Sequence, residues 1–258
     1  MISLRRFQTE EVCVECPGLP GAGAHVTFAL VCDVHLRRWG TQHDRLLALV
    51  EERGVDFVFL VGDAIDRHRR GMQCLERLIR GLRARHGVFV VRGNYEVAYA
   101  PPPRRLRPLL EQWGARLLLN EARLVPTAAG PVCVAGLDDP RHGWPDTAAV
   151  LAAARAPACL RVLLSHAPVA AALLPPGHSF DLVLAGHTHG GQVRVPLWKR
   201  APFRFYRGWT DGLYRVGSAQ LYVSRGFGAV GRFPLRLGCP AELAFFLIHG
   251  PPEGKERQ

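Results

Sequence analysis

DFVFLVGD, residues 56–63, is the stretch that decides the fold, because five consecutive apolar residues lead directly into Gly-Asp. Two other stretches repeat this plan, VTFALVCD at 26–33 and GVFVVRGN at 87–94. Between them, HDRLLALVEER (43–53) and MQCLERLIRGLRAR (72–85) carry apolar residues at helical spacing. Strand, helix, strand, helix and strand within about 70 residues predict β-α-β units around a parallel sheet.

The rest of the chain predicts a second sheet. Asp44 is the expected N-cap of the first helix, and a further helix is expected near 147–156. The predicted strands are 115–120, 122–128 and 131–139, adjoining in the second sheet, then 160–168, 181–189, a hairpin over 212–226 around Gly217-Ser218, and 241–248. We therefore expect one α/β domain over residues 1–250, two sheets with helices outside them, and a disordered tail at 251–258.

Composition and charge narrow the class of protein. The chain has 258 residues, 48% hydrophobic and 21% charged, which is typical of a globular protein. It has no apolar run of about 18 residues that would span a membrane, and its first 18 residues lack the apolar stretch of a signal peptide. The net charge is +11, and all but two of the 33 basic residues are arginine. This charge favours phosphate substrates, nucleic acid or an acidic membrane surface, although a coding bias toward arginine also accounts for it.

The cysteines indicate a reducing compartment. There are 7 of them, an odd number scattered along the chain. Cys13 and Cys16 form a C-x-x-C, but no second pair lies at zinc-ribbon spacing. We interpret all seven as free thiols, and together with the missing signal peptide they favour the cytoplasm.

Compact oxygen and nitrogen ligands follow five of the predicted strands. The carboxyl ends of strands in an open α/β sheet form a ligand crevice, so these side chains are expected to converge. Two Asp, one Asn and four His suit a pair of borderline divalent ions such as Mn²⁺, Fe²⁺ or Zn²⁺. The residues are Asp33, His35, Asp63, Asn94, His166, His187 and His189.

The spacing of these ligands has a physical reason. In D-x-H and H-x-H, residues i and i+2 point the same way in extended backbone, so one strand end is expected to offer two ligands to one cluster. Glycines beside the ligands are expected to permit tight turns and a close approach of the backbone. They are Gly62, Gly93, Gly186, Gly190 and Gly191.

The motifs DVH, GDAID, GNYE, SHAP and GHTHGGQ, in this order, resemble those of the calcineurin-like metallophosphoesterases. Longer stretches such as ECPGLPGAGAHVTFALVCDVH and GHTHGGQVRVP resemble the YkuE-like bacterial branch, which includes enzymes similar to UDP-2,3-diacylglucosamine hydrolases. The resemblance covers about residues 12–248. It implies a four-layer α/β/β/α sandwich, in agreement with the predicted strands.

The resemblance also implies roles for the seven ligands. Asp33, His35 and His189 would bind a first metal ion, and Asn94, His166 and His187 a second, while Asp63 would bridge the two. The implied reaction is the attack of a metal-bound hydroxide on phosphorus, in line with the leaving group.

One position departs from the family pattern. The motif is usually G-N-H-D/E, and its His assists the leaving group, whereas here it is Gly93-Asn94-Tyr95-Glu96. The companion Asp of the family is present as Asp66. A neutral phenol donates a hydrogen bond but supplies no positive charge near neutral pH. We hypothesise slow hydrolysis of esters with poor leaving groups, or a leaving group such as a nucleotide phosphate that needs little protonation. The alternative is that Tyr95 only packs and that another group or water provides the proton.

Two basic segments are candidates for contact with substrate. Residues 197–210 combine Arg200, Arg204 and Arg207 with aromatic side chains, which predicts a flap for substrate or a membrane surface or else a packed connector. Residues 100–110, APPPRRLRPLL, either rim the site with arginines or form a loop that opens a helix.

The leading prediction is therefore a hydrolase that cleaves a phosphodiester or pyrophosphate bond with two divalent ions, manganese first. The expected substrate is a small phosphate ester or a nucleotide-linked glycolipid, with a possible peripheral contact to the inner membrane surface. The alternatives are a glycolipid pyrophosphatase of the UDP-2,3-diacylglucosamine type, a metal-binding pseudoenzyme and a basic nucleic-acid-binding protein. No specific nucleic-acid contact is expected, because no nucleic-acid-binding motif is present.

Overall fold

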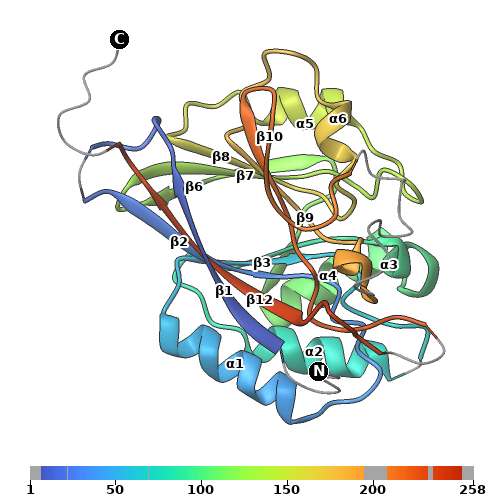
Figure 1. The fold of residues 1–258 in the computed structure, drawn as a ribbon. Coiled ribbons are helices and arrows are strands. Elements are labelled where there is room, and N and C mark those ends of the chain that lie inside the picture. The colour runs from blue at the N-terminus through green and yellow to red at the C-terminus, as the bar shows by residue number, and fades with distance from the viewer. Residues whose placement is uncertain (1–6, 22, 69, 195–207, 232–234, 252–258) are drawn as a thin grey trace.

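Two six-stranded sheets pack face to face in the computed structural model of the chain, which describes residues 7–21, 23–68, 70–194, 208–231 and 235–251 (Figure 1). Helices cover the outer face of each sheet, so the layers run helix, sheet, sheet, helix. This is the four-layer α/β/β/α arrangement expected from the sequence.

The first sheet has the strand order β1-β12-β2-β3-β4-β5. The strands β2 to β5 run parallel to one another, β12 runs antiparallel to β2, and β1 runs parallel to β12. The bounds are β1 (Phe7–Glu15), β2 (His25–Val31), β3 (Phe57–Val61), β4 (Val88–Val91), β5 (Ala115–Leu117) and β12 (Ala241–His249).

The second sheet has the order β10-β11-β9-β8-β7-β6. Its four central strands are parallel, and β6 and β10 form antiparallel edges. The bounds are β6 (Glu121–Thr127), β7 (Gly130–Gly136), β8 (Leu160–Leu164), β9 (Leu182–Ala185), β10 (Gly212–Val216) and β11 (Ala219–Val223).

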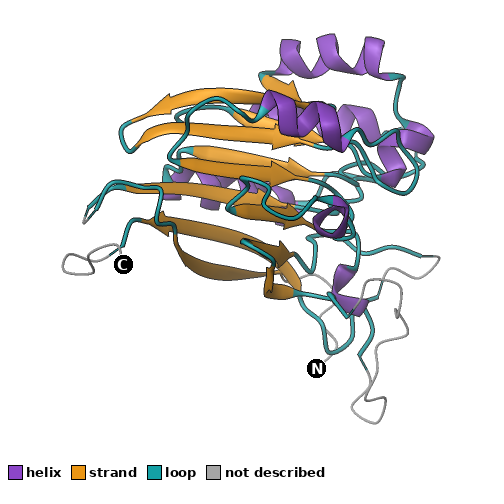
Figure 2. Ribbon diagram, turned by 90° about the horizontal axis from the view of Figure 1, so that it is seen from above, coloured by secondary structure: helices purple, strands orange, loops and turns teal. Residues whose placement is uncertain are grey.

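The helices divide between the two outer faces. Those on the first sheet are α1 (Thr41–Arg53), α2 (Gly71–Gly81) and α4 (Pro103–Trp113), whereas α5 (Thr147–Ala153) and α6 (Ala170–Leu173) cover the second. Two short elements, α3 (Asn94–Tyr99) and the 3₁₀ turn η1 (His189–Gly191), follow β4 and β9. Figure 2 shows most strand arrows pointing toward the side of the molecule where the loops gather.

The central strands β2, β3 and β4 of the first sheet are buried on both faces, so alternate residues serve different cores. On β2, Ala29 and Val31 pack under the helices, while Phe28 and Leu30 face the other sheet. The Phe28 ring stacks on Phe246 with 4.5 Å between ring centroids. The continuous apolar runs that predicted buried strands thus follow from burial between two layers.

Three local expectations are wrong. Residues 115–120 were expected in the second sheet, but β5 pairs parallel with β4 because α4 completes another β-α-β unit on the first sheet. The helix α1 begins two residues before the expected start, with Gly40 as its N-cap. Asp44 lies in the first turn and accepts a hydrogen bond from Trp39 Nε1 (2.7 Å).

The strand β1 was not expected at all. Its residues are mostly exposed, and it forms the edge of the first sheet beside β12. Glu10 on β1 accepts a hydrogen bond from Arg225 (2.9 Å), whose Nε also lies 3.0 Å from the buried Glu242 of β12. This strand is therefore tied to the loop after β11 by charge as well as by backbone pairing.

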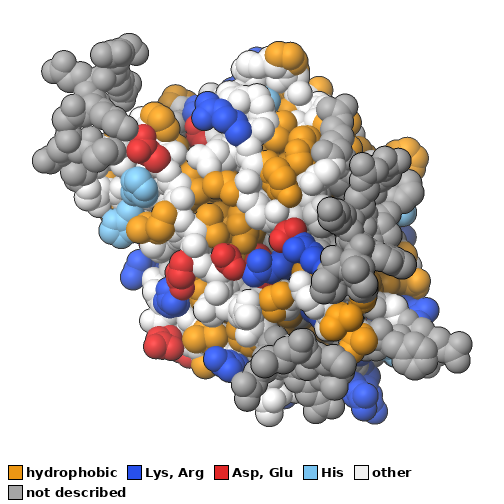
Figure 3. Space-filling model, in the orientation of Figure 1, with side chains coloured by type: hydrophobic (Ala, Val, Ile, Leu, Met, Phe, Trp, Pro, Cys, Tyr) orange, Lys and Arg blue, Asp and Glu red, His pale blue; other side chains and the backbone are white. Residues whose placement is uncertain are grey.

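The surface gives two further observations. Among the described residues, none of the helices has both the length and the apolar character needed to cross a membrane. On the face drawn in Figure 3, Lys and Arg side chains are interspersed with acidic and apolar ones and form no continuous basic stripe in the described part.

Replacing Phe28 with Ala is expected to lower the free energy of unfolding by about 3–5 kcal/mol, because a fully buried ring between the sheets leaves a cavity. Leu247→Ala on β12, where the side chain is 39% exposed, serves as the matched control and should cost about 1 kcal/mol or less. Urea unfolding of both variants checks this; equal losses would contradict the assigned core.

Candidate metal centre

The candidate metal centre lies where strands of both sheets end. The carboxyl ends of β2, β3 and β4 in one sheet face those of β8 and β9 in the other, and backbone hydrogen bonds continue past the strands. Asp33 N donates to Gly62 O (3.1 Å) and Gly186 N to His166 O (2.9 Å). The seven predicted ligands follow these five strands, as the sequence indicates.

The first ligand group consists of Asp33, His35 and His189. His189 Nε2 lies 3.1 Å from His35 Nε2 and 3.4 Å from Asp33 Oδ1. His35 Nε2 lies 4.0 Å from the same Asp33 oxygen. All three residues are buried, so two imidazole nitrogens and one carboxylate oxygen converge on one point.

The second group consists of Asp63, His166 and His187. His166 Nε2 lies 3.3 Å from Asp63 Oδ2 and 3.1 Å from His187 Nδ1. The ligand atoms are therefore Nε2 of one histidine and Nδ1 of the other.

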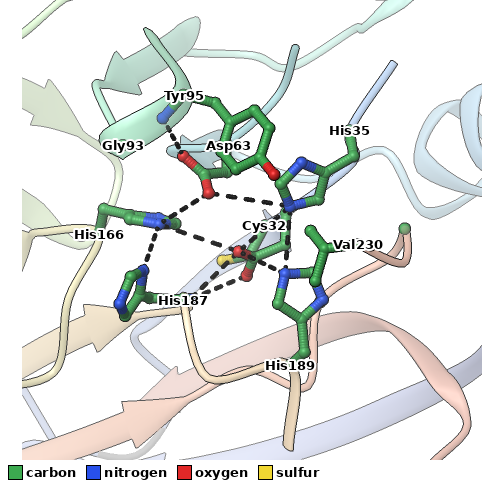
Figure 4. Close-up of polar contacts among 12 residues, drawn as sticks. Cys32, His35, Asp63, Gly93, Tyr95, His166, His187, His189 and Val230 are labelled. Carbon is green, nitrogen blue, oxygen red and sulfur yellow. Dashed lines mark hydrogen bonds and ion pairs between the residues drawn. The ribbon is translucent and has the colours of Figure 1, made fainter. Parts of the chain in front are cut away.

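The two groups lie side by side and contact each other (Figure 4). Asp63 Oδ2 lies 3.7 Å from His35 Nε2, and Asp33 Oδ1 lies 3.9 Å from His166 Nε2. Each carboxylate thus faces an imidazole of the other group, and Asp63 has the position of a bridging ligand.

Asn94 is the seventh candidate ligand. Its Oδ1 is buried and has no hydrogen-bond partner in the described part of the chain, and the same holds for His35 Nδ1. A buried amide oxygen without a partner is costly, and a bound cation would satisfy it.

The residues present fit two divalent ions. Atoms that bind one ion at about 2.0–2.2 Å lie about 3–3.5 Å apart, close to the 3.1–3.4 Å of four contacts in the two groups. The contact between His35 Nε2 and Asp33 Oδ1 is longer, at 4.0 Å. The mixture of imidazole, carboxylate and amide ligands is typical of manganese, iron or zinc sites.

The ligands sit on left-handed backbone, which contradicts the expectation of extended D-x-H and H-x-H segments. Five of them have positive φ: Asp33 (52°), His35 (48°), Asp63 (49°), His187 (71°) and His189 (51°). Such conformations cost of order 1–3 kcal/mol each and gather at functional sites. Asp33 and His35 lie in one group, whereas His187 and His189 lie in different groups, as the family resemblance implies.

Glycine lets the backbone reach both carboxylates, as expected. A Cβ on Gly93 would overlap Asp63 Oδ1, and one on Gly186 would overlap Asp33 Oδ2. Each aspartate is thus fixed against a strand end that admits no side chain.

The buried charges perturb one another strongly. Burial lowers the pKa of His166, but the Asp63 and Asp33 carboxylates outweigh this and raise it to about 10. Burial raises the pKa of Asp33 to about 7, and it lowers that of His35 to about 4. Burial also lowers the pKa of His187 to about 3, helped by positive charge on His166.

The carboxylate of Asp63 behaves differently. Burial raises its pKa, but His166, His35 and the Tyr95 backbone N–H hold the pKa well below its usual range. A pocket that keeps the Asp63 carboxylate ionised at this depth favours cations, and a cation that binds there would displace the proton of His166.

The sequence profile of the calcineurin-like phosphoesterases matches residues 26–191. The chain belongs to this family. It is 30% identical over 249 residues to the uncharacterized metallophosphoesterase YkuE of Bacillus subtilis, covering 94% of this chain and 85% of YkuE. It is therefore a metal-dependent phosphoesterase, which confirms the family and the enzyme class expected from the motifs.

Other relatives are longer than this phosphoesterase. The uncharacterized metallophosphoesterase Cj0846 of Campylobacter jejuni is 30% identical, over 96% of this chain and 65% of that protein. The transmembrane protein with metallophosphoesterase domain of Bos taurus is 29% identical, over 91% of this chain and 55% of that protein. Among solved structures, the sulfate thiohydrolase SoxB of Thermus thermophilus shares the fold, with a TM-score of 0.54, 17% identity and coverage of 89% of this chain and 57% of that one.

The phosphoesterase places Tyr95 at the rim of the site. Its ring stands edge-on to His35, with 4.6 Å between centroids (Figure 4), and its backbone N–H donates to Asp63 Oδ1 (2.8 Å). Asp66 is buried but accepts from Arg37 Nε (2.7 Å) and Arg67 N (2.7 Å). No hydrogen bond joins Asp66 to Tyr95 in the described part of the chain, so their catalytic roles stay predictions.

Two residues that support the ligands were missed by the sequence analysis. Glu96, at 4% exposure, accepts hydrogen bonds from the backbone N–H groups of Asp63 (2.7 Å), Ile65 (3.0 Å) and Gly93 (2.9 Å). Its position in GNYE was a usable signal, since a helix-capping Glu at the third helical position commonly reaches back to the backbone.

Arg236 carried no comparable signal. Its buried guanidinium lies 3.2 Å from His189 Nδ1 and donates to Gly226 O (3.0 Å) and Gly228 O. It comes from a segment 47 residues beyond His189 and reaches the site only through tertiary folding. The three candidate substrate residues Arg200, Arg204 and Arg207 lie outside the described residues.

The phosphoesterase is expected to take up two divalent ions per chain, and Asp63→Asn should bind them at least tenfold more weakly because it lies between both groups. Elemental analysis after loading, and the rise in melting temperature on adding Mn²⁺, measure this. His25→Ala, an exposed histidine at the start of β2, is the control. Uptake of two ions by Asp63→Asn with unchanged affinity would contradict the assignment.

Glu96→Ala is expected to destabilise the fold by about 3 kcal/mol or more, because it leaves three buried N–H groups without an acceptor. Glu76→Ala removes an exposed ion pair with Arg80 (2.9 Å) and should change stability by about 0.5 kcal/mol at most. Chemical denaturation compares the two; similar small losses would show that Glu96 does not support the site.

Proposed function

We propose that this phosphoesterase hydrolyses a phosphodiester or pyrophosphate bond with two divalent ions, of which Mn²⁺ is the preferred one. Asp33, His35 and His189 would hold one ion, and the other would be held by Asn94, His166 and His187. Asp63 would bridge them. The observation that supports this most is the position of Asp63 between the two groups. Its Oδ2 lies 3.3 Å from His166 Nε2 and 3.7 Å from His35 Nε2.

The chemistry divides between the ions and the chain. Two divalent ions held by these residues would supply Lewis acidity, which lowers the pKa of a water and offsets charge on the phosphoryl oxygens. The chain holds the ligand geometry: Glu96 fixes the turn that carries Asp63, and Arg236 packs against His189. Rigid ligands matter because displacements of about 1 Å reduce rates by about 10²-fold.

The leaving group decides between substrates. Burial raises the pKa of Tyr95, with further contributions from Asp66 and Asp63, so the phenol stays neutral and supplies no positive charge. Such a site suits a leaving group that needs little protonation, such as a nucleotide phosphate. For any other leaving group, a second side chain or water has to provide the proton.

The net charge and the cysteines bear on the partners and the cellular compartment of the protein. The +11 charge draws anionic substrates to the protein, and we propose a small phosphate ester or a glycolipid. The interspersed charges on the face drawn in Figure 3 give no support to a specific nucleic-acid contact there. All seven cysteines are free, which supports a reducing compartment, the cytoplasm. A peripheral contact with the membrane remains part of this proposal and can be tested by liposome binding.

With Mn²⁺ the protein is expected to hydrolyse bis-p-nitrophenyl phosphate, whose leaving group needs little acid assistance. Asp63→Asn should lower kcat by about 10²-fold or more, whereas His25→Ala should match the parent. Removal of metal with a chelator should abolish turnover and readdition should restore it. Full activity after chelation, or no turnover with any divalent ion, would sink the proposal; the latter outcome would identify a pseudoenzyme.

A metal-loaded screen distinguishes the substrate classes, with Asp63→Asn as the blank. Nucleotides, simple phosphodiesters and a UDP-linked glycolipid form its arms. A preference for the pyrophosphate of the glycolipid, together with binding to liposomes, would favour the glycolipid pyrophosphatase. Salt-sensitive DNA binding that persists in chelator would favour a nucleic-acid-binding protein instead.

A further inference from the structure

A second acid–histidine pair lies beside the metal centre, outside the family motifs. The strand β7 runs parallel to β8, and past its end Leu137 N donates to Leu164 O (3.0 Å). Because β8 leads into His166 two residues after Leu164, the chain that follows Leu137 enters its loop next to the second ligand group. This loop, residues 138–146, carries Asp139 and His142.

The pair joins a buried carboxylate to a half-exposed imidazole. Asp139 Oδ2 accepts a hydrogen bond from His142 N (2.8 Å) and lies 3.0 Å from His142 Nδ1. The Asp139 side chain is 0% exposed and the His142 side chain 51%. The contact uses Nδ1, so the imidazole can present its other nitrogen, Nε2, to a substrate.

One oxygen of the Asp139 carboxylate accepts no hydrogen bond from the described part of the fold. Its Oδ1 is buried and has no hydrogen-bond partner in the described ranges. A carboxylate buried beside the metal centre with one oxygen unsatisfied is costly as a purely structural feature. It fits better as a group that orients the His142 imidazole through its other oxygen, Oδ2.

The loop that carries the pair is held rigidly. Arg92, at the end of β4, forms a buried two-pronged ion pair with Asp138, at 3.0 and 2.6 Å. Asp138 Oδ2 also accepts from Trp144 N (2.8 Å), and Asn120 bonds both Asp138 N (3.0 Å) and Trp144 O (2.7 Å). Since Arg92 precedes Asn94 by two residues, these contacts fix the loop to the strand ends of both sheets.

The position expected to carry this role offers no such pair. Tyr95 is a phenol, and the Asp66 oxygens are occupied by Arg37 Nε and Arg67 N. Asp139 and His142, in contrast, have the geometry of an imidazole oriented by a carboxylate, which is the arrangement that proton-donating histidines use.

We propose that His142, oriented by Asp139, donates a proton to the leaving oxygen. This inference rests on the proposed function and deepens it. The oxygen of water bonds to phosphorus as the bond between phosphorus and the leaving oxygen breaks. The leaving oxygen takes the proton from His142 Nε2, whose imidazolium becomes neutral imidazole. The proton lost by the attacking water returns to Nε2 through solvent.

The test uses aryl phosphodiesters whose leaving groups range from p-nitrophenol to unsubstituted phenol and weaker acids. His142→Ala should keep kcat on the p-nitrophenyl ester within about threefold of the parent and lower it by about 10²-fold or more on the poorest leaving group. Asp139→Asn should make kcat fall more steeply with poorer leaving groups than in the parent, but less steeply than in His142→Ala. The KM should be unchanged in both variants. His142→Asn, which keeps a polar side chain, should follow His142→Ala.

Controls separate this role from folding and metal binding. His142→Ala should still take up two ions by elemental analysis and should melt within about 2–4 °C of the parent. His25→Ala should show the leaving-group dependence of the parent. Tyr95→Phe should change that dependence little.

Three outcomes overturn the proposal. They are an unchanged leaving-group dependence in His142→Ala, an equal loss on all esters, and a steepened dependence in Tyr95→Phe instead. A parent that shows no metal-dependent hydrolysis of the p-nitrophenyl ester overturns the proposed function, and the role of His142 with it. An active parent with an unaffected His142→Ala overturns the role of His142 alone.

Discussion

Two buried carboxylates, Asp33 and Asp63, face the same small space from neighbouring strands, and the other side chains of the site offset their buried negative charge. Their charges repel, and burial penalises both. Imidazoles from the opposite sheet offset part of this: His166 lies 3.3 Å from Asp63 Oδ2 and 3.9 Å from Asp33 Oδ1. The two sheets are thus held together by charge at this edge and by apolar packing elsewhere, and a pair of cations is the natural complement.

The sequence predicted this site because strand ends are local features. An apolar run followed by Asp, Asn or His indicates both the strand and the candidate ligand, and five such runs end at one edge, where six of the seven candidate ligands form two groups. The ligand backbone could not be predicted in the same way. Positive φ at Asp33 or His189 comes from tertiary packing against residues far along the chain, so the expected extended conformation of the ligand backbone was wrong.

Partners distant in sequence account for the other failures. Arg236 supports His189 from a different segment, and no local pattern marks an arginine for such a role. The edge strand β1 has little apolar periodicity, since its stability comes from pairing with β12 at the other end of the chain. The strand β5 has only three residues, too few to show which sheet it joins. The fold class was therefore readable from the sequence, whereas the edges of the sheets were not.

The position of β12 has a consequence for how the protein is made. The strands β1 and β2 are consecutive in the chain, yet β12 lies between them and hydrogen-bonds to both. During synthesis from the N-terminus, β1 has no strand to pair with until residues 241–249, which form β12, leave the ribosome. Closure of the first sheet is thus a late, long-range event, and a nascent chain has all seven ligands before it has the complete scaffold that holds them.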